Sequence, residues 1–270
     1  MAISGRIIVT GATGSMGAAA VEALAAQGKA VLMACRNLKK AELVRADILS
    51  RIPQADLAIR QLDLASMASV RMFVDSLDDE PVEALFNNAG VISKSYFTTL
   101  DGFENTFSVN YFGPVLLTRL LIPKMVPDAR IVNMVSLTCR YVSVDEGSLR
   151  PAPGDFSQLG TYARAKLAML RFSMELARRC PQLRINLADP GIVNSNMISM
   201  GRWFDPLADI LFRPFCKSPQ KGAGPALAAL SSPERNRYFV GKRCTTIPSR
   251  FQDPDLDLRL WNETEKIIQL

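Results

Sequence analysis

The amino-acid sequence predicts an α/β fold, in which one domain holds a doubly wound parallel sheet of about seven strands with helices on both faces. Short apolar runs alternate with amphipathic segments along most of the 270 residues. Several runs are apolar at consecutive positions, which is typical of strands that are buried on both faces. Glycine or asparagine follows several of these runs, as expected where a strand turns into a helix.

The predicted elements follow one another in β–α order. The predicted strands are Arg6–Thr10, Ala30–Cys35, Leu57–Leu62, Val82–Phe86, Arg130–Val135 and Leu183–Ala188. The predicted helices are Ser15–Gln27, Leu38–Ser50, Ser66–Leu77, Phe103–Met125 and Ser157–Arg179. Right-handed crossovers between parallel strands then place helices on both faces of one sheet.

Two segments interrupt this rhythm. Leu137–Gly160 has no period and carries several prolines and glycines, so we expect a long loop. The segment 196–220 contains the aromatic and apolar stretch Arg202–Phe215 and follows the carboxyl end of a strand, where doubly wound sheets bind ligands. We expect a small lid over a lipophilic substrate. The same side chains could instead pack on the core, on a second subunit of a homodimer or tetramer, or on a membrane surface.

Composition excludes several classes of function. The chain has no histidine, which removes the Ser-His-Asp triad, the Cys-His pair and histidine-based zinc sites. Its five cysteines are scattered without a C-x-x-C pair, as in a cytoplasmic protein with reduced thiols. The net charge of +6 is spread without a long basic tract, so we expect no nucleic-acid partner. We also expect neither a secretion signal nor a membrane-spanning helix.

A glycine-rich loop joins the first strand to the first helix. Its glycines are Gly11, Gly14 and Gly17, and the residues between them include Thr13, Ser15 and Met16. Glycine lets the backbone approach a pyrophosphate closely, and the free N–H groups of a helix N-terminus favour anions. Because the loop has the strand–turn–helix context that such motifs need, it predicts a dinucleotide site.

The end of the second strand indicates which dinucleotide binds. An acidic residue about 20 positions after the glycines would select NAD(H), but Arg36 and Asn37 stand there instead. A guanidinium can bind a 2′-phosphate with two hydrogen bonds, so we expect NADP(H) rather than NAD(H), with Lys39 or Lys40 in support. Asp63, which Leu64 follows, is placed to reach the adenine amino group.

The reacting residues are predicted around one helix. Tyr162 and Lys166 lie four positions apart and therefore on one helix face, where an ammonium would lower the pKa of the phenol. A phenolate can exchange a proton with an alcohol while a hydride moves to or from a nicotinamide. Ser136 ends the fifth strand, and Asn110, inside a predicted helix, needs a polar partner such as a helix carbonyl. The stretch from Pro190 and Gly191 through Val193 to Ser195 can wall the nicotinamide.

Taken together, these motifs resemble the short-chain dehydrogenase/reductase family, over nearly the whole chain from Arg6 onward. The matching pieces, in order, are Thr10–Gly17, Asn87–Gly90, Asn110, Ser136, Tyr162–Lys166 and Pro190–Ser195. The stretches ACRN, NNAGV and VNYFGP and the long spacing from Ser136 to Tyr162 resemble the branch of retinol dehydrogenases and WW-domain oxidoreductases. Ser195 stands where the family usually has threonine, and Asp189 where asparagine or histidine is frequent.

The resemblance implies a Rossmann-fold oxidoreductase and a role for each residue. Tyr162 would be the acid/base, Lys166 would hold the nicotinamide ribose, Ser136 would orient the substrate oxygen and Asn110 would support a proton-relay water. The remaining contacts to the cofactor would come from Gly11, Ser15 and Gly17 at the phosphates, from Asn88, Ala89 and Gly90 on the adenosine side, and from Ser195 at the carboxamide. Two alternatives use the same fold: a regulator that senses NADP(H) without turnover, and an epimerase or dehydratase.

Overall fold

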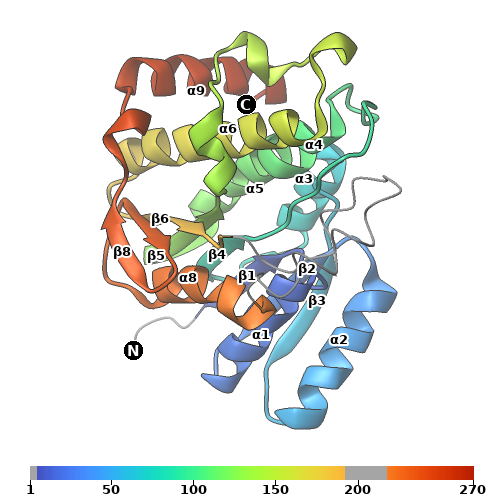
Figure 1. Cartoon of the computed structure of the whole chain (residues 1–270). Coiled ribbons are helices and arrows are strands. Elements are labelled where there is room, and N and C mark those ends of the chain that lie inside the picture. The colour runs from blue at the N-terminus through green and yellow to red at the C-terminus, as the bar shows by residue number, and fades with distance from the viewer. Residues whose placement is uncertain (1–4, 192–217) are drawn as a thin grey trace.

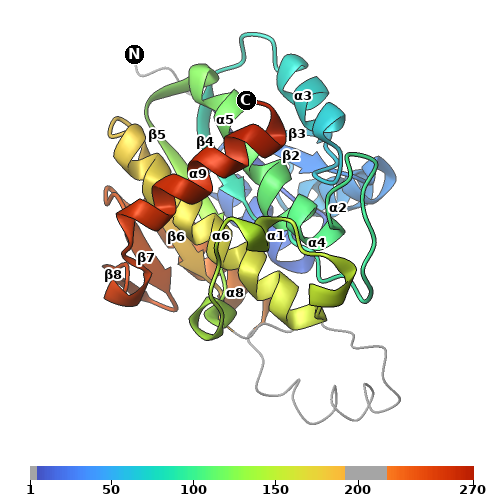
Figure 2. The same ribbon diagram turned by 90° about the horizontal axis from the view of Figure 1, so that it is seen from above.

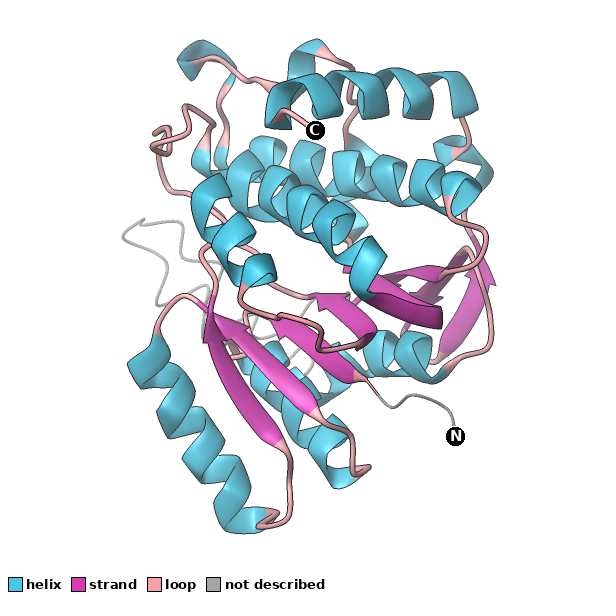
Figure 3. Ribbon diagram, turned by 180° about the vertical axis from the view of Figure 1, so that it is seen from behind, coloured by secondary structure: helices cyan, strands magenta, loops and turns pink. Residues whose placement is uncertain are grey.

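The computed structural model describes residues 5–191 and 218–270, which form one α/β domain with a sheet between two helical layers (Figure 1, Figure 3). The eight-stranded sheet has the order β3-β2-β1-β4-β5-β6-β7-β8. Its strands are β1 (Arg6–Thr10), β2 (Val31–Cys35), β3 (Leu57–Gln61), β4 (Val82–Asn87), β5 (Met125–Met134), β6 (Arg184–Asp189), β7 (Arg237–Val240) and β8 (Arg243–Thr246). The first seven pair in parallel, and β8 pairs antiparallel with β7. The sheet therefore has one antiparallel edge strand beyond the predicted parallel strands.

Helices cover both faces of the sheet, as predicted. One face carries α1 (Ser15–Ala26), α2 (Leu38–Arg51) and α8 (Pro219–Ser231). The other carries α3 (Met67–Asp75), α5 (Gly113–Leu121) and α6 (Gln158–Arg179). The C-terminal helix α9 (Pro254–Ile268) lies against the outer side of α6, where Figure 2 shows it above the sheet-covering helices. Within the described ranges, no helix has the length and apolar character needed to cross a bilayer.

The apolar runs form strands because their alternate side chains enter two separate cores. On β1, Ile8 belongs to the cluster under α3, α5 and α6, whereas Val9 belongs to the cluster under α1, α2 and α8. Leu85 and Phe86 of β4 divide in the same way, and all four side chains are at most 1% exposed. Burial on both faces is what makes a parallel strand apolar at consecutive positions. The carboxyl ends of the strands thus lie at one edge, which leaves their loops to build a site.

The predicted helix Phe103–Met125 is present as one helical run from Asn105 to Lys124, but it is not α-helical throughout. The short helix α4 (Asn105–Phe107) continues through a π-helical turn at Ser108–Phe112 into α5, and a 3₁₀ turn at Ile122–Lys124 precedes β5, which begins at Met125. Pro114 has no N–H to donate to a carbonyl four residues earlier, and the Asn110 side chain donates to the Thr106 carbonyl at 2.7 Å. Both features favour the wider π turn, a local geometry that is frequent at functional sites.

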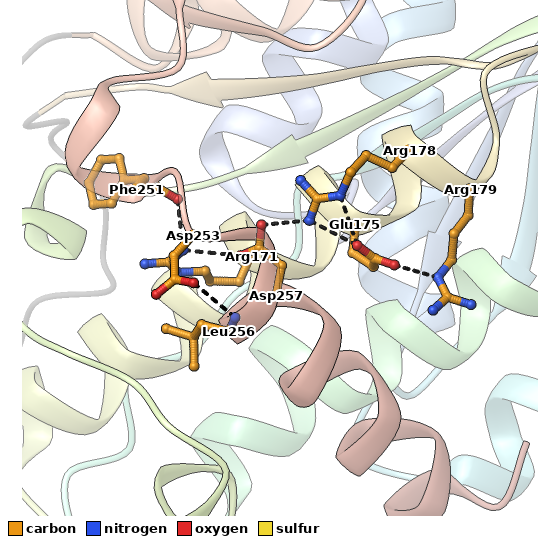
Figure 4. Close-up of polar contacts among 8 residues, drawn as sticks. All are labelled: Arg171, Glu175, Arg178, Arg179, Phe251, Asp253, Leu256 and Asp257. Atoms are coloured by element: carbon orange, nitrogen blue, oxygen red, sulfur yellow. Dashed lines mark hydrogen bonds and ion pairs between the residues drawn. The ribbon is translucent and has the colours of Figure 1, made fainter.

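A buried ion-pair network holds α9 against α6 (Figure 4). Asp257 of α9 is fully buried, and its two carboxylate oxygens lie 3.1 Å from the Arg171 guanidinium and 2.7 Å from that of Arg178. Arg171 also donates to the Phe251 carbonyl at 2.8 Å, and Glu175 binds Arg178 from the same helix. Removing one partner of such a network leaves an uncompensated buried charge, so the contacts fix where α9 lies.

One of the two predicted irregular segments can be compared with the structure in full, and the other only at its end. The long loop predicted at Leu137–Gly160 is present, with short 3₁₀ turns at Leu137–Tyr141, Gly147–Leu149 and Pro153–Asp155 before α6 begins at Gln158. The lid predicted at 196–220 lies outside the described residues as far as position 217, and its last two residues begin α8.

Candidate active site

A cleft of about 590 Å³ opens at the carboxyl ends of β1 to β4. It brings together residues from four loops that are far apart in the sequence. The predicted cofactor residues on its walls are Gly11, Thr13, Gly14, Ser15, Met16, Gly17, Arg36, Asn37, Asp63, Leu64, Asn88, Ala89 and Gly90. The walls also include residues that were not predicted as contacts, namely Ala34, Leu62, Val91 and Val109. Val91 and Val109 directly adjoin predicted motifs, and this adjacency is the signal that could have revealed them.

The glycines of the loop allow close packing against the loop after β4 and at the start of α1. Gly11 has a φ of +63°, and a Cβ added there would lie 2.9 Å from the Cα of Ala89. A Cβ on Gly17 would lie only 2.3 Å from the Gly11 carbonyl oxygen. The missing side chains therefore let α1 begin directly beside the loop, with its N-terminus at the cleft. This cradle fits the pyrophosphate of a dinucleotide cofactor.

Hydrogen bonds lock this loop to the loop after β4. The Thr10 hydroxyl accepts the N–H groups of Asn88 and Ala89, each at 3.0 Å. The Asn88 amide in turn donates to the Thr10 carbonyl at 2.8 Å. Cys35 supports the loop from β2, because its sulfur accepts the backbone N–H groups of Ala12 and Thr13. Burial nevertheless raises the pKa of the Cys35 thiol to about 11, and these bonds only partly oppose the rise.

The side of the cleft beyond β2 is basic. Arg36 and Lys40 both line it and are exposed, whereas Lys39 does not line it. Asn37 caps α2 by accepting the Lys40 N–H at 2.9 Å, which keeps the start of that helix at the cleft wall. Asp63 also lines the cleft, after the neighbouring strand β3, and one of its oxygens accepts the Ala65 N–H at 2.9 Å.

The predicted reacting residues meet at the ends of β5 and β6. Ser136 follows β5, and its hydroxyl accepts that of Thr138 at 2.9 Å. On α6, Tyr162 is half-buried and Lys166 is 4% exposed. The Lys166 ammonium donates to the Met134 carbonyl at 3.0 Å and lies 5.8 Å from the centre of the Tyr162 ring. The four-residue spacing on α6 and the position of Ser136 after β5 together bring the Ser136 hydroxyl, the Tyr162 phenol and the Lys166 ammonium into one site.

The pKa of Tyr162 moves opposite to the prediction. Burial raises it, the electrostatic effects of Cys139 and Asp189 add to the rise, and a hydrogen bond with Ser136 only partly opposes it. The ammonium of Lys166 is itself buried, which lowers the pKa of Lys166 to about 8. Burial is thus the largest cause of both shifts, and it moves each pKa toward the neutral form of the group.

Asn110 connects the two halves of the site. Its amide donates to the carbonyls of Thr106 at 2.7 Å and Val91 at 2.8 Å, and its oxygen accepts the Val91 N–H at 3.3 Å. The expected helix carbonyl is thus one partner. Because Val91 lines the cleft, Asn110 ties the cleft wall to the π turn next to α6.

The turn after β6 is fixed by a residue whose role the sequence left open. Asp189 is 1% exposed and accepts the Gly191 N–H at 2.8 Å, which holds the Pro190–Gly191 turn at the sheet edge. Its second oxygen accepts the Tyr238 hydroxyl from β7 at 2.8 Å. The predicted nicotinamide contacts Val193 and Ser195 lie outside the described residues.

The chain matches known proteins along nearly its whole length. The family model described as short chain dehydrogenase matches residues 6–202. Human retinol dehydrogenase 14 is 32% identical, over 98% of this chain and 86% of that protein. The WW domain-containing oxidoreductase of Danio rerio is 34% identical, over 97% of this chain and 68% of that protein.

Solved structures share the fold. An uncharacterized protein from Mycobacterium paratuberculosis aligns with a TM-score of 0.79 and 27% identity, over 98% of this chain and 93% of that one. A short-chain dehydrogenase from Sphingobium yanoikuyae in complex with NADPH has a TM-score of 0.67 and 18% identity, over 88% of each chain. The family match, the relatives and the architecture agree, and the chain is a member of the short-chain dehydrogenase/reductase family of oxidoreductases, in its retinol-dehydrogenase-like branch.

Proposed function

We propose that the protein transfers a hydride between NADP(H) and an alcohol or carbonyl carbon of a lipophilic small molecule, with Tyr162 as the acid/base. The observation that carries the proposal is the meeting of Ser136, Tyr162 and Lys166 at the ends of β5 and β6, beside a cleft built by a glycine loop. A bound nicotinamide supplies the hydride chemistry.

The residues of the chain divide the remaining work. Tyr162 exchanges a proton with the substrate oxygen, and Ser136 orients that oxygen by a hydrogen bond. Lys166 holds the nicotinamide ribose through its ammonium. Asn110 supports a water that relays protons between the site and solvent. The stretch from Pro190 to Ser195 contacts the nicotinamide.

The contacts with the adenosine half follow from the cleft walls. The N–H groups at Gly11–Gly17 bind the phosphates, and Asn88–Gly90 lies along the adenosine. Arg36 binds the 2′-phosphate with support from Lys40. Lys40 is the better candidate for this support because it lines the cleft, whereas Lys39 does not. Asp63 binds the adenine amino group. The exposed cations on this wall support NADP(H) over NAD(H).

The substrate class rests on the aromatic lid sequence and on the relatives. Two of the relatives at about one-third identity are called retinol dehydrogenases, and retinol is a lipophilic alcohol. We propose a retinoid, steroid, lipid aldehyde or aromatic ketone as the substrate, with 196–220 as its lid. We further propose that the protein is cytoplasmic and can rest on a membrane surface. The cytoplasmic location is supported by the four cysteines in the described part of the chain, none of which forms a disulfide.

The test is turnover with NADPH and a panel of lipophilic aldehydes and ketones, followed by nicotinamide absorbance. We expect Tyr162→Phe to lose at least about a hundredfold in kcat, the lower range for general acid catalysis, while its NADPH affinity stays unchanged. A variant that keeps most of its kcat contradicts the proposed acid/base. Tight NADPH binding by the wild type without turnover of any compound would instead favour a cofactor-sensing regulator.

A further inference from the structure

A cavity of about 370 Å³ lies at the edge of the sheet opposite the candidate active site. Arg237, the first residue of β7, and Thr246, the last residue of β8, both line it and pair with each other across that hairpin. The cofactor cleft opens instead at the carboxyl ends of the parallel strands. α6, the loop before β7 and the segment before α9 supply the remaining walls. The cavity is therefore separate from the cleft, and its volume is typical of small-molecule sites, which hold about 300–1,000 Å³.

The walls of this cavity carry cations and no carboxylate. Arg178, Arg235 and Arg237, here called the wall arginines, line it, and none of its lining residues in the described chain is acidic. Their side chains are 38% to 41% exposed, so a ligand from solvent can reach them. Such walls attract an anion. The other polar side chains on the walls are those of Asn236, Thr246 and Gln252.

Carboxylates that do not line the cavity hold two of the guanidiniums in place. Glu234 accepts Nε of Arg237 at 2.9 Å. Glu175 accepts Nε of Arg178 at 2.9 Å, and Asp257 accepts its Nη2 at 2.7 Å (Figure 4). Nη1 of Arg178 and both Nη atoms of Arg237 have no partner among residues 5–191 and 218–270. Both side chains are thus ordered before a ligand arrives and keep donors free for it, which lowers the entropic cost of binding.

Arg235 is held by a carboxylate and two carbonyls. Its Nη2 binds Asp128, and its Nη1 donates to the carbonyls of Pro181 and Leu183. Its Nε has no partner in the described part of the chain. Each wall arginine therefore keeps at least one free N–H group.

Positive charge exceeds negative charge in the ion pairs around the cavity. The four carboxylates that bind the wall arginines also bind Arg171, Arg179 and Arg184, so that six arginines share four carboxylates. The Asp253 carboxylate caps α9 one residue before Pro254 of the wall, and the cations still outnumber the anions when it is counted. The internal ion pairs thus leave the arginines short of negative charge.

A phosphate group fits three guanidiniums better than a carboxylate does. Both anions match the planar fork of arginine. A phosphate monoester, however, has three acceptor oxygens and a charge of about −1.5 to −2 at pH 7, whereas a carboxylate has two oxygens and one charge. The cavity also has an apolar part for an organic group, made by Met174, Ile247 and Pro254.

We propose that this cavity is a binding site for a small organic phosphate monoester. The phosphate binds the three wall arginines, and the organic group packs on the apolar part of the walls. The site is independent of the hydride transfer proposed above, because it lies at the other edge of the sheet and shares no lining residue with the cofactor cleft.

Arg237→Gln is the variant that tests the site. It removes one wall charge and breaks only an exposed ion pair, with Glu234, so the fold should persist. Arg259→Gln is the matched control, since it breaks a similar exposed pair, with Glu146, away from the cavity walls. Arg36→Gln controls for phosphate that binds in the cofactor cleft instead.

Isothermal titration calorimetry at fixed ionic strength measures the affinity for phenyl phosphate. We expect Arg237→Gln to weaken binding about tenfold, the lower range for one charge-assisted hydrogen bond, because solvent screens an exposed arginine. Arg259→Gln and Arg36→Gln should each keep a site of wild-type affinity. Equal affinities in Arg237→Gln and the wild type overturn the proposal, as does binding that only Arg36→Gln abolishes. An equal loss in Arg259→Gln also overturns it, because a general charge effect then explains the binding.

Two further probes test the ligand class on the wild-type protein. Inorganic phosphate lacks the organic group, and benzoate replaces the phosphate by a carboxylate. We expect both to bind more weakly than phenyl phosphate. Benzoate that binds as tightly refutes the phosphate assignment, and inorganic phosphate that binds as tightly refutes the apolar subsite. No binding of phenyl phosphate at about 10 mM, a concentration that would fill a site with a Kd of about 1 mM, refutes the site itself. None of these measurements needs turnover, so their outcome does not depend on the proposed function.

Discussion

Replacing Asp257 by asparagine tests how strongly the C-terminal helix is tied to the helix that carries Tyr162. Asp257 is fully buried, and the side chain of its partner Arg171 is 8% exposed. The substitution keeps the volume but removes the charge, so that the Arg171 cation remains buried with the neutral carbonyl of Phe251 as its other hydrogen-bond acceptor. The change tests the contact through charge alone.

The expected cost follows from this burial. Breaking a buried ion pair on one side typically costs about 3–5 kcal/mol, because the remaining charge is uncompensated. Arg178, with a side chain 39% exposed, adds little because solvent screens it. Glu265→Gln is the matched control: the same chemical change on the same helix breaks a pair with Arg119 whose side chains are 31% and 29% exposed. It should cost about 1 kcal/mol or less.

Urea denaturation followed by circular dichroism measures both variants. We expect the midpoint for Asp257→Asn to fall well below that for Glu265→Gln, with the slope of the transition unchanged. The double variant Arg171→Met/Asp257→Leu should recover most of the loss, since no buried charge remains in this pair. Equal costs for Asp257→Asn and Glu265→Gln would refute the reasoning.

Three further variants test the cleft and the reacting end. Lys166→Met should raise the free energy of unfolding by about 1–3 kcal/mol at pH 7. Burial lowers the pKa of Lys166 from 10.5 to about 8, so burying its charged form costs free energy, and the hydrogen bond to the Met134 carbonyl only partly offsets this cost. The folded protein gives up this proton at lower pH than the unfolded chain. The advantage should therefore shrink as pH rises from about 8 to 10.5 in a urea series, and a constant difference would contradict it. Gly113→Ala should cost about 1–3 kcal/mol on thermal or urea denaturation, since its Cβ would lie 2.3 Å from the Leu64 carbonyl oxygen; a neutral result would mean that Leu64 can move. Arg36→Asp should reverse the proposed preference for NADP(H), with a change in affinity of roughly ten- to a hundredfold for each charge-assisted bond lost. Unchanged kcat/KM ratios for the two cofactors at fixed ionic strength would make Arg36 a surface charge.

Local sequence alone determined the order of strands and helices as far as β6, and the loops that build the cleft. The glycines between β1 and α1 and the polar residues after β2, β3 and β4 were predicted because strand–turn–helix patterns are short-range. Parallel pairing then brings every such loop to one edge of the sheet, so predicted residues from four loops line one cleft. The spacing of Tyr162 and Lys166 was likewise enough to place them on one face of α6.

Only the tertiary structure decided how these residues behave. Asn110 of the π turn binds Val91 from another loop, and Asp189, which holds the Pro190–Gly191 turn, binds Tyr238, a residue 49 positions later in the sequence. The pKa of Tyr162 rises because the folded chain removes water around the phenol. Burial and long-range hydrogen bonds are properties of neighbours far apart in the sequence, and a residue pattern carries neither until the chain has folded.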